Sequence, residues 1–313
     1  MKYLGRKSVV EKNSVAIPMV LIPAGEFLMG SSETADQLLE FAKKTGWEDA
    51  KLDYFSDEHP QHRVRLTQPF FVSQREITKG DFAKFASATG YLTEAERDEK
   101  GGYGYDAASG NFEQLEKYNW KNVGASPYGD NHPVVNVTWN DAQKYIEWLN
   151  NQMEGGGYRL LTESEWEYCA RAGTTTRYPT GDDPETLVKI GNVADGTAKA
   201  KFANWRAIAA KDGYVFTAPT GTYAANNFGL YDMIGNVFEW CEDVYDAKYY
   251  GQFAGKTAID PVGPAAVGGS QRVYRGGGWD NDAVYCRSAD RYFNSPVHRI
   301  SNLGFRLALS SAK

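Results

Sequence analysis

Two early segments have hydrophobic patterns that indicate β-strands, one a continuous apolar run and the other an alternation of apolar and polar residues. Residues 19–30, MVLIPAGEFLMG, are apolar on either side of a Pro23-Ala24-Gly25 turn, which predicts a β-hairpin. In residues 62–77, Val64 and Leu66 alternate with arginines until Pro69 interrupts the pattern, which predicts two strands. We expect both segments to lie at the edge of a sheet or within a small sheet.

Three further segments have the spacing of amphipathic helices, and each begins with a threonine followed three residues later by an acid. The threonine hydroxyl can accept hydrogen bonds from free amides of the first turn, and the helix dipole stabilises the acid. Thr162 with Glu165 alone meets the strict capping-box pattern; the other pairs are Thr78 with Asp81 and Thr138 with Asp141. The predicted apolar faces are Phe82, Phe85 and Ala86; Ala142, Tyr145, Ile146 and Leu149; and Trp166, Cys169 and Ala170.

The rest of the chain has little regular pattern. Residues 94–131 are rich in Gly, Asp, Asn and Tyr without a clear period, which predicts a long surface excursion. After the third helix the pattern is typical of short strands and loops. Because no internal repeat or linker divides the chain, we expect one domain over residues 1–313.

Composition supports a folded protein and excludes some partners. The 313 residues are 42% hydrophobic and 24% charged, while 32 glycines, 8 Trp, 20 Tyr and 15 Phe predict large side chains covering irregular backbone. The net charge of −6 offers no basic field, so we expect no nucleic-acid partner. No apolar run has signal-peptide or membrane-spanning length, so we expect no membrane span in this chain.

Cysteine and histidine give little indication of a metal site. The three cysteines, Cys169, Cys241 and Cys286, are too few and too scattered for a disulfide framework or paired metal ligands. His59 and His62 lie in EHPQH, where a proline prevents the helix that such a pair would need. The sequence also lacks a phosphate-binding glycine loop and the common hydrolase motifs.

Two acidic and amide-rich clusters have the hard oxygen ligands that calcium requires. The first joins Asn204-Trp205 to Asp212-Gly213-Tyr214, and the second joins Asp232 to the bend GNVFE that ends at Glu239. From the residues alone, each cluster is either a calcium site or a pair of ordinary Asx turns.

Six ordered motifs resemble the formylglycine-generating-enzyme, or sulfatase-modifying factor, family. They are MVLIPAGEFLMGS, HPVVNVTWNDAQKYIEWLN, RLLTESEWEYCARAG, NNFGLYDMIGNVFEW, RVYRGGGW and GFRLA, and they span nearly the whole chain. The resemblance implies a single α+β domain with a variant of the C-type lectin fold, many loops and little regular secondary structure. It also implies structural calcium at two ligand sets: Asn204, the Trp205 carbonyl, Asp212 and the Tyr214 carbonyl; and Asp232, the Gly235 and Val237 carbonyls and Glu239.

The chain departs from this family at the active site. The enzymes use two cysteines that bind copper and exchange with a substrate thiol. Here the matching segment reads RGGGWDNDAVYCRSA, in which Cys286 keeps the second cysteine position and Asn281 takes the first. Because thiol exchange and two-coordinate copper binding need both sulfurs, we expect neither oxidase activity nor copper binding.

The tail, residues 272–308, is similar to the variable region of proteins diversified by retroelements, which use the same type of scaffold. In those proteins miscopied AAC codons become codons ending in a pyrimidine, which never encode Lys, Gln, Glu, Met or Trp. An ordinary polar loop that avoids these residues by chance is the alternative. The positions we assign to such codons all hold permitted residues: Asp280, Asn281, Asp282, Val284, Tyr285, Asp290, Tyr292, Phe293, Asn294, Ser295, Val297, His298, Ile300, Ser301 and Asn302.

The residues between these positions are expected to form a fixed frame. Mixed aromatic and short polar residues on irregular backbone are typical of adaptable binding surfaces. Around them, we expect inward packing from Trp279, Ala283, Cys286, Ala289, Phe305 and Leu307, and contacts with carbonyls or buried acids from Arg275, Arg287, Arg291, Arg299 and Arg306.

The sequence therefore predicts a non-enzymatic, receptor- or adhesin-like protein whose variable tail binds an unidentified ligand, most often a protein for such surfaces. Exposure to ligands implies a cell-surface or secreted location, with anchoring through a segment outside this chain. The alternatives are an oxidase of the formylglycine-generating type, or a relative that uses one cysteine, and a partner or chaperone module with a fixed tail.

Overall fold

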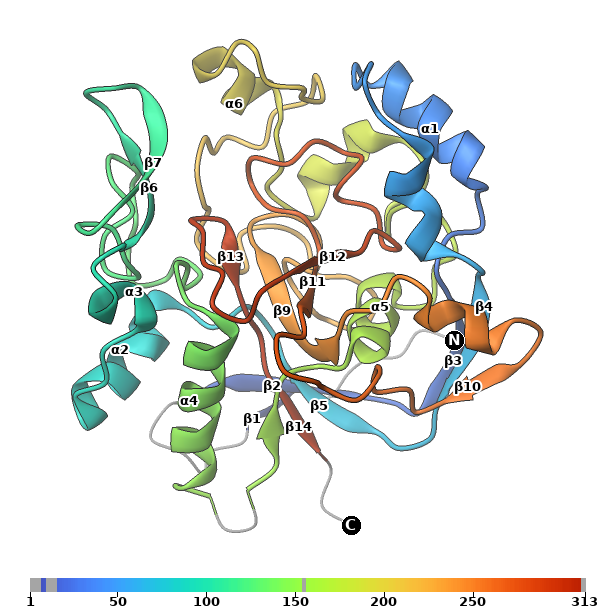
Figure 1. The fold of residues 1–313 in the computed structure, drawn as a ribbon, viewed down its shortest axis with the longest axis horizontal. Coiled ribbons are helices and arrows are strands. Elements are labelled where there is room, and N and C mark those ends of the chain that lie inside the picture. The colour runs from blue at the N-terminus through green and yellow to red at the C-terminus, as the bar shows by residue number, and fades with distance from the viewer. Residues whose placement is uncertain (1–6, 10–15, 154–155, 311–313) are drawn as a thin grey trace.

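Short strands and helices are linked by long loops in the computed structural model, which describes residues 7–9, 16–153 and 156–310 (Figure 1). The strands are β1 Lys7–Val9, β2 Pro18–Ile22, β3 Gly25–Met29, β4 His62–Leu66, β5 Phe70–Ser73, β6 Gly102–Asp106, β7 Asn111–Leu115, β8 Tyr158–Arg159, β9 Phe238–Val244, β10 Thr257–Ile259, β11 Arg272–Arg275, β12 Tyr292–Asn294, β13 Leu303–Gly304 and β14 Ala308–Ser310. The helices are α1 Ala35–Lys44, α2 Lys79–Thr89, α3 Glu94–Arg97, α4 Trp139–Asn150, α5 Glu163–Arg171 and α6 Gly196–Lys201, with 3-10 turns η1 Leu52–Glu58, η2 Pro184–Lys189 and η3 Tyr249–Phe253.

Within the described residues the strands form four sheets. Their orders are β1-β2-β5-β14-β8, β10-β4-β3, β12-β11-β9-β13 and β6-β7. The first sheet joins the two ends of the chain, because β14 pairs antiparallel with β5 and β8. The β12-β11-β9-β13 sheet contains most of the regular structure of the tail, and Figure 1 shows this red segment crossing the middle of the molecule.

The predicted strands are present, but the predicted hairpin over residues 19–30 is wrong. β2 pairs with β1 and β5, whereas β3 pairs with β4 in a different sheet. Each strand finds a buried partner elsewhere, such as Val72 of β5 opposite Val20 of β2. Pro23 and Ala24 therefore carry the chain between two sheets. The expected pair in residues 62–77 is confirmed as β4 and β5, although β5 lies inside the five-stranded sheet.

The three predicted helices are confirmed as α2, α4 and α5. In each, the N-cap threonine accepts from the amide of the acid three residues on, and that acid accepts from the threonine amide. Asp81 and Asp141 therefore form capping boxes with Thr78 and Thr138, in the same way as Glu165 does with Thr162. α1 was not predicted, although Thr34 and Gln37 close the same box before it.

Residues 94–131 are more ordered than the predicted surface excursion. They contain α3 and the β6–β7 hairpin, and Tyr118 and Trp120 are buried. Trp120 packs against Phe82 of α2, with ring centroids 5.2 Å apart. The stretch lacks a sequence period because its aromatic residues are anchored to helices outside it.

Two large apolar clusters form the interior. One surrounds Trp166 and Cys169 of α5, and the other surrounds Tyr145 of α4 together with Phe305 and Trp240. Both include residues of the tail, so the tail is part of the core rather than an appended loop. Among the described helices, none has both the length and the apolar character needed to cross a membrane.

Candidate ligand-binding surface

The tail passes from β11 through a long irregular loop to β12, and then through a second loop to β13. β12 pairs antiparallel with β11, with Phe293 opposite Val273 and Tyr292 opposite Tyr274. β13 pairs parallel with β9, with Leu303 opposite Phe238. The two loops are therefore fixed at both ends by one sheet.

The frame prediction for the apolar residues of the tail is confirmed. Each of the predicted residues is buried, with at most 5% of its surface exposed: Trp279, Ala283, Cys286, Ala289, Phe305 and Leu307. Trp279 lies in a cluster of aromatic rings from distant segments, including Phe112 of β7 and Phe216.

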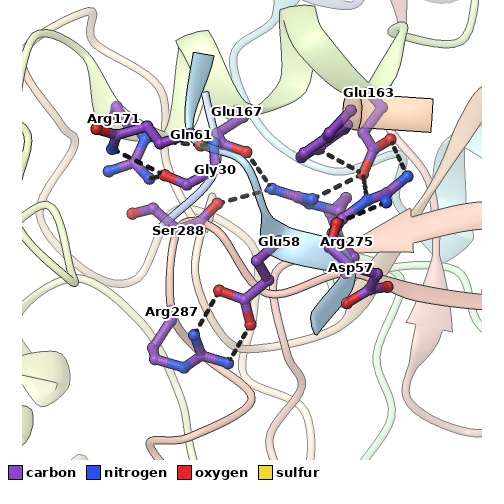
Figure 2. A network of polar contacts seen from close by, with 12 residues as sticks. Gly30, Asp57, Glu58, Gln61, Glu163, Glu167, Arg171, Arg275, Arg287 and Ser288 are labelled. Carbon is purple, nitrogen blue, oxygen red and sulfur yellow. Dashed lines mark hydrogen bonds and ion pairs between the residues drawn. The ribbon is translucent and has the colours of Figure 1, made fainter. Parts of the chain in front are cut away.

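The frame prediction for the arginines is also confirmed. Arg275 and Arg291 share a buried acid from outside the tail, and Figure 2 shows Arg275 among these acids. Arg275 donates to Glu163 at 2.8 Å and to Glu167 at 2.6 Å, both on α5. Arg291 donates to both oxygens of Glu163, at 2.8 and 3.0 Å. Because these side chains are almost fully buried, breaking one pair leaves an uncompensated charge.

Arg287 anchors the middle of the first loop. Its two terminal nitrogens donate to the two oxygens of Glu58, each at 2.7 Å, and one also donates to Asp290 at 2.9 Å. Glu58 ends η1, so this fork joins the tail to the segment that follows α1. Figure 2 shows the Arg287–Glu58 pair beside the Arg275 cluster.

The two remaining arginines hold the second loop and the end of the tail. Arg299 donates to both oxygens of Asp98, at 2.6 and 2.5 Å, and to the Gly101 carbonyl at 2.9 Å. Arg306 donates to both oxygens of Glu239, with a shortest distance of 2.6 Å. The tail is therefore fixed at five arginines, each of which donates more than one hydrogen bond from its planar guanidinium group.

Eleven of the fifteen predicted variable residues are exposed or half-buried. The most exposed are Val297 at 49% and Phe293 at 37%. The full set is Asp280, Asn281, Tyr285, Tyr292, Phe293, Asn294, Ser295, Val297, His298, Ile300 and Ser301.

The other four predicted variable residues are buried and have contacts within the fold. Asp282 accepts from Arg206 at 2.6 Å and from the Val284 amide, while Val284 is 1% exposed in a small apolar cluster with Leu38 and Phe55. Asp290 pairs with Arg287, and Asn302 donates to Asp280 at 2.6 Å. These positions cannot contact a ligand without rearrangement, so we leave them out of the proposed contact surface.

An aromatic cleft of about 540 Å³ lies on one side of β12. The tail contributes Tyr285, Asp290, Arg291, Tyr292 and Phe293 to its lining. The opposite side comes from outside the tail: Trp47, Asp53, Tyr54, Phe55, Ser56, Asp57, Tyr245 and Ala247. Burial raises the pKa of the Tyr285 and Tyr292 hydroxyls, so both remain neutral donors at physiological pH.

A polar cleft of about 620 Å³ borders the second loop. Its tail residues are Asn294, Ser295, Val297, His298 and Arg299. The other residues that line it are Glu94, Arg97, Asp98, Lys100 and Gln114. The predicted variable positions thus border two clefts of different chemistry. Residues up to Phe293 line the aromatic cleft, and residues from Asn294 onward line the polar cleft.

The cysteines do not form a reactive pair. All three are buried free thiols, and burial raises the pKa of each well above its usual value. The Cys286 sulfur lies 3.8 Å from the Asn281 carbonyl oxygen. The Asn281 side chain accepts from the Gly278 amide at 3.0 Å and so braces the start of the loop.

The second calcium ligand set lies in a buried cluster that is rich in carboxylates. Glu76, Asp232 and Glu239 are all buried there, and Arg306 is the cation that faces them. Glu239 is committed to Arg306 and to the Trp166 indole, but one oxygen of Asp232 is buried without a hydrogen-bond partner. Burial and the neighbouring carboxylates raise the pKa values of Glu76 and Asp232, and a divalent cation beside Asp232 would offset the same repulsion.

The first calcium ligand set is only partly assembled. The Asp212 carboxylate accepts from the Val193 and Tyr214 amides, and it lies beside Asp195. Burial raises the pKa of Asp212 to about 7, with the Asp195 charge adding to the effect. Asn204 is exposed, and none of the hydrogen bonds among the described residues joins its side chain to Asp212.

His62, one of the two histidines in EHPQH, has an ordinary packing role. His62 is buried against Tyr250 and Phe253, with ring centroids 4.7 and 5.2 Å away. Burial lowers its pKa, so the ring is neutral at physiological pH. Across the described residues, no three His, Cys, Asp or Glu side chains are arranged to hold a metal ion by themselves.

Sequence reasoning missed the half of the aromatic cleft that lies outside the tail. Trp47, Tyr54 and Asp57 belong to a segment without helical or strand period, and Tyr245 follows β9 by one residue. A weak signal exists in residues 47–57, where aromatic residues and acids occur together without alternation. Their meeting with the tail depends on the Glu58–Arg287 pair, which no local pattern predicts.

Comparison with known proteins places these features in a family. Residues 6–311 match the sulfatase-modifying factor enzyme 1-like domain. The formylglycine-generating enzyme of Streptomyces coelicolor is 35% identical over 315 residues, covering 92% of this chain and 88% of that protein.

Two solved structures share the fold over nearly their whole length. PvdO from Pseudomonas aeruginosa is 27% identical with a TM-score of 0.72, covering 97% of this chain and 98% of its own. Treponema denticola variable protein 1 is 21% identical with a TM-score of 0.63, covering 98% and 99%. The predicted fold class is thereby confirmed: an α+β, C-type-lectin-like fold of the formylglycine-generating-enzyme type, with many loops.

Proposed function

The chain belongs to the sulfatase-modifying factor enzyme 1-like family, and on that premise we propose that it is a ligand-binding protein rather than an oxidase. The observation that carries this proposal is the separation of the tail into two sets of residues. Buried apolar residues and arginines fix its path, whereas eleven predicted variable residues lie exposed or half-buried, several of them beside two clefts. Such a surface can change its contacts without changing its backbone.

We propose that retroelement-directed variation of the tail generates this surface. The gene itself provides the test, since the codons of the predicted variable positions should end in pyrimidines. A nearby copy of the tail carrying AAC at the same positions, together with a reverse transcriptase gene, would support the proposal. Frequent purine-ending codons at these positions would contradict it and would favour a partner or chaperone module with a fixed tail.

Oxidase activity is the second candidate, because the Streptomyces coelicolor relative is named a formylglycine-generating enzyme. It predicts copper binding through Cys286 and conversion of a cysteine-containing peptide. We expect neither, because Cys286 is buried, its pKa is raised, and Asn281 stands at the first cysteine position. A copper titration followed by absorbance of the thiolate–copper band, with a Cys286→Ser control, separates the two functions.

We further propose that calcium stiffens the scaffold near Asp232. The buried carboxylates there exceed the single guanidinium of Arg306, and a divalent cation would offset that charge. The resemblance to the family adds the Gly235 and Val237 carbonyls and Glu239 to the ligand set, and Glu239 would have to release a contact with Arg306 or Trp166 to bind the ion. The Asn204, Trp205, Asp212 and Tyr214 set would need Asn204 to move inward before it could bind.

The ligand is proposed to be a protein, because the surface offers aromatic and short polar side chains around two open clefts. A binding role of this kind requires exposure to ligands, so we propose a cell-surface or secreted location with anchoring outside this chain. Fractionation of the native organism, with antibody detection of the full-length protein, tests that location.

A further inference from the structure

The aromatic cleft has one wall that lies outside the predicted variable tail. Trp47 and Tyr54 stack with ring centroids 5.4 Å apart, and Trp47 also contacts Tyr285 at 5.1 Å. On the other side, Tyr245 stacks on Phe293 at 3.7 Å. If the tail varies, the chemistry of this fixed wall is common to every version of the protein.

Three acids line the cleft, Asp53, Asp57 and Asp290, and Arg291 is the one cationic residue among the lining residues. Asp53 is exposed, and no ion pair to it is formed by the described residues. Asp57 is 8% exposed, and the Tyr245 hydroxyl donates to its carboxylate at 2.7 Å. A buried carboxylate with a neutral donor as its hydrogen-bond partner remains attractive to a cation.

Arg291 does not supply that cation. It is the only arginine or lysine among the residues that line the cleft, and its guanidinium donates to both oxygens of Glu163. Its contact with Asp57 is to the backbone carbonyl, at 2.9 Å, and not to the carboxylate. Its charge is shared with Glu163 and also acts on Asp57. One cation therefore faces three acids in the lining, so the cleft is a poor site for an anion.

Beside the cleft, an aromatic ring and a carboxylate of this chain already bind a cationic side chain together. The Arg206 guanidinium lies 4.8 Å from the centroid of the Trp47 ring and donates to Asp282 at 2.6 Å. An aromatic ring and a carboxylate therefore hold a cationic side chain together next to the cleft. Guanidinium and ammonium groups both bind aromatic faces in this way.

We propose that the aromatic cleft binds an arginine or lysine side chain of a protein ligand. Asp57 pairs with the cationic group, Tyr54 and Tyr245 supply fixed aromatic contacts, and Tyr285, Tyr292 and Phe293 supply the variable ones. The cleft volume of about 540 Å³ is sufficient for a long side chain and part of its backbone. This inference rests on the proposed function in assuming that the ligand is a protein.

The test is selection of a random peptide library, displayed on phage, against the immobilised full chain. We expect the selected peptides to be enriched in arginine or lysine over the unselected library. For a selected peptide, Asp57→Asn should weaken binding by about tenfold or more, because a charge-assisted hydrogen bond is lost. Asparagine keeps an oxygen that accepts from the Tyr245 hydroxyl, so the variant should stay folded.

Asp49→Asn is the matched control, because Asp49 is exposed, carries the same charge and does not line the cleft. It should leave peptide binding unchanged. Should Asp57→Asn unfold the protein, Tyr54→Ala replaces it, since Tyr54 is 49% exposed and should lower affinity without affecting the core.

Three outcomes would overturn the inference. Equal weakening by the two aspartate variants would show general attraction to an acidic protein. Selected peptides without basic enrichment, whose binding is lost in Phe293→Ser, would contradict the cationic ligand but leave the proposed function intact. Failure to select any peptide that depends on the tail or the cleft would contradict both.

Discussion

At the scale of single residues, burial separates the tail positions that hold the fold from those that can vary. Asp282 and Asp290 satisfy the same compositional rule as Asn294 and Ser295, yet the first two are buried and paired with arginines. Residue type therefore indicates only which positions are compatible with codons that end in a pyrimidine. It did not predict which side chains reach the surface, because that depends on acids and arginines brought together from distant segments.

Asp280 gives a pH-dependent prediction at this scale. Asp280 is half-buried, and desolvation of its carboxyl group raises its pKa to about 6, although Asn302 donates a hydrogen bond to the carboxylate. Because the folded pKa lies above the unfolded value of about 3.9, the folded state favours the protonated acid, and this stability is lost as pH rises through 6. We expect Asp280→Asn to be more stable than the wild type at pH 7.5, by about 1 kcal/mol, and equally stable near pH 4.

Urea unfolding at the two pH values measures this difference. A stability gap of the same size at both would mean that Asp280 does not titrate in this range. Asp49→Asn, at an exposed position, is the control for a simple change in net charge.

At the scale of elements, local chemistry was predictable and pairing was not. The N-termini of α2, α4 and α5 follow from a threonine and an acid three residues apart, all within one turn. The pairings of β2 with β5 and of β3 with β4 were missed, because each joins residues more than thirty positions apart. The fixed half of the aromatic cleft was missed for the same reason.

The link between η1 and the tail gives a prediction at this scale. Glu58→Gln would leave Arg287 buried with only Asp290 as its acidic partner, so we expect a loss of about 3–5 kcal/mol in the free energy of unfolding. Glu26→Gln breaks an exposed pair with Arg63 and Arg65 and should change little.

Chemical denaturation of the two variants checks this difference. If Glu58→Gln unfolds at the same denaturant concentration as Glu26→Gln, the buried fork does not fix the tail. Measured binding of a selected peptide should fall in Glu58→Gln, since η1 carries part of the cleft.

At the scale of the whole molecule, the fold is stabilised mainly by residues other than the exposed predicted variable positions. The two large apolar clusters and the five anchored arginines surround the exposed positions without including most of them. The resemblance in sequence identified the family and fold class correctly. The separation of the tail into fixed and exposed positions required the three-dimensional contacts.

Calcium gives a prediction for the whole fold. At saturating calcium we expect the melting temperature to rise by about 4 °C over that in chelator, because the ion binds the folded state alone. Magnesium should have a smaller effect, since it prefers a smaller octahedral site. Asp232→Asn should reduce the calcium response, and identical melting curves with calcium and chelator would contradict the proposed site.

The central claim is that a fixed frame carries an interchangeable binding surface, and a display library measures this most directly. In one library, the eleven exposed or half-buried positions are randomised among the residues permitted in the tail; in the other, the four buried positions Asp282, Val284, Asp290 and Asn302 are randomised. We predict that most clones of the first library resist protease and yield binders to different proteins, whereas most clones of the second lose resistance. Equal loss of resistance in both libraries, or no binder from the first, would contradict the account.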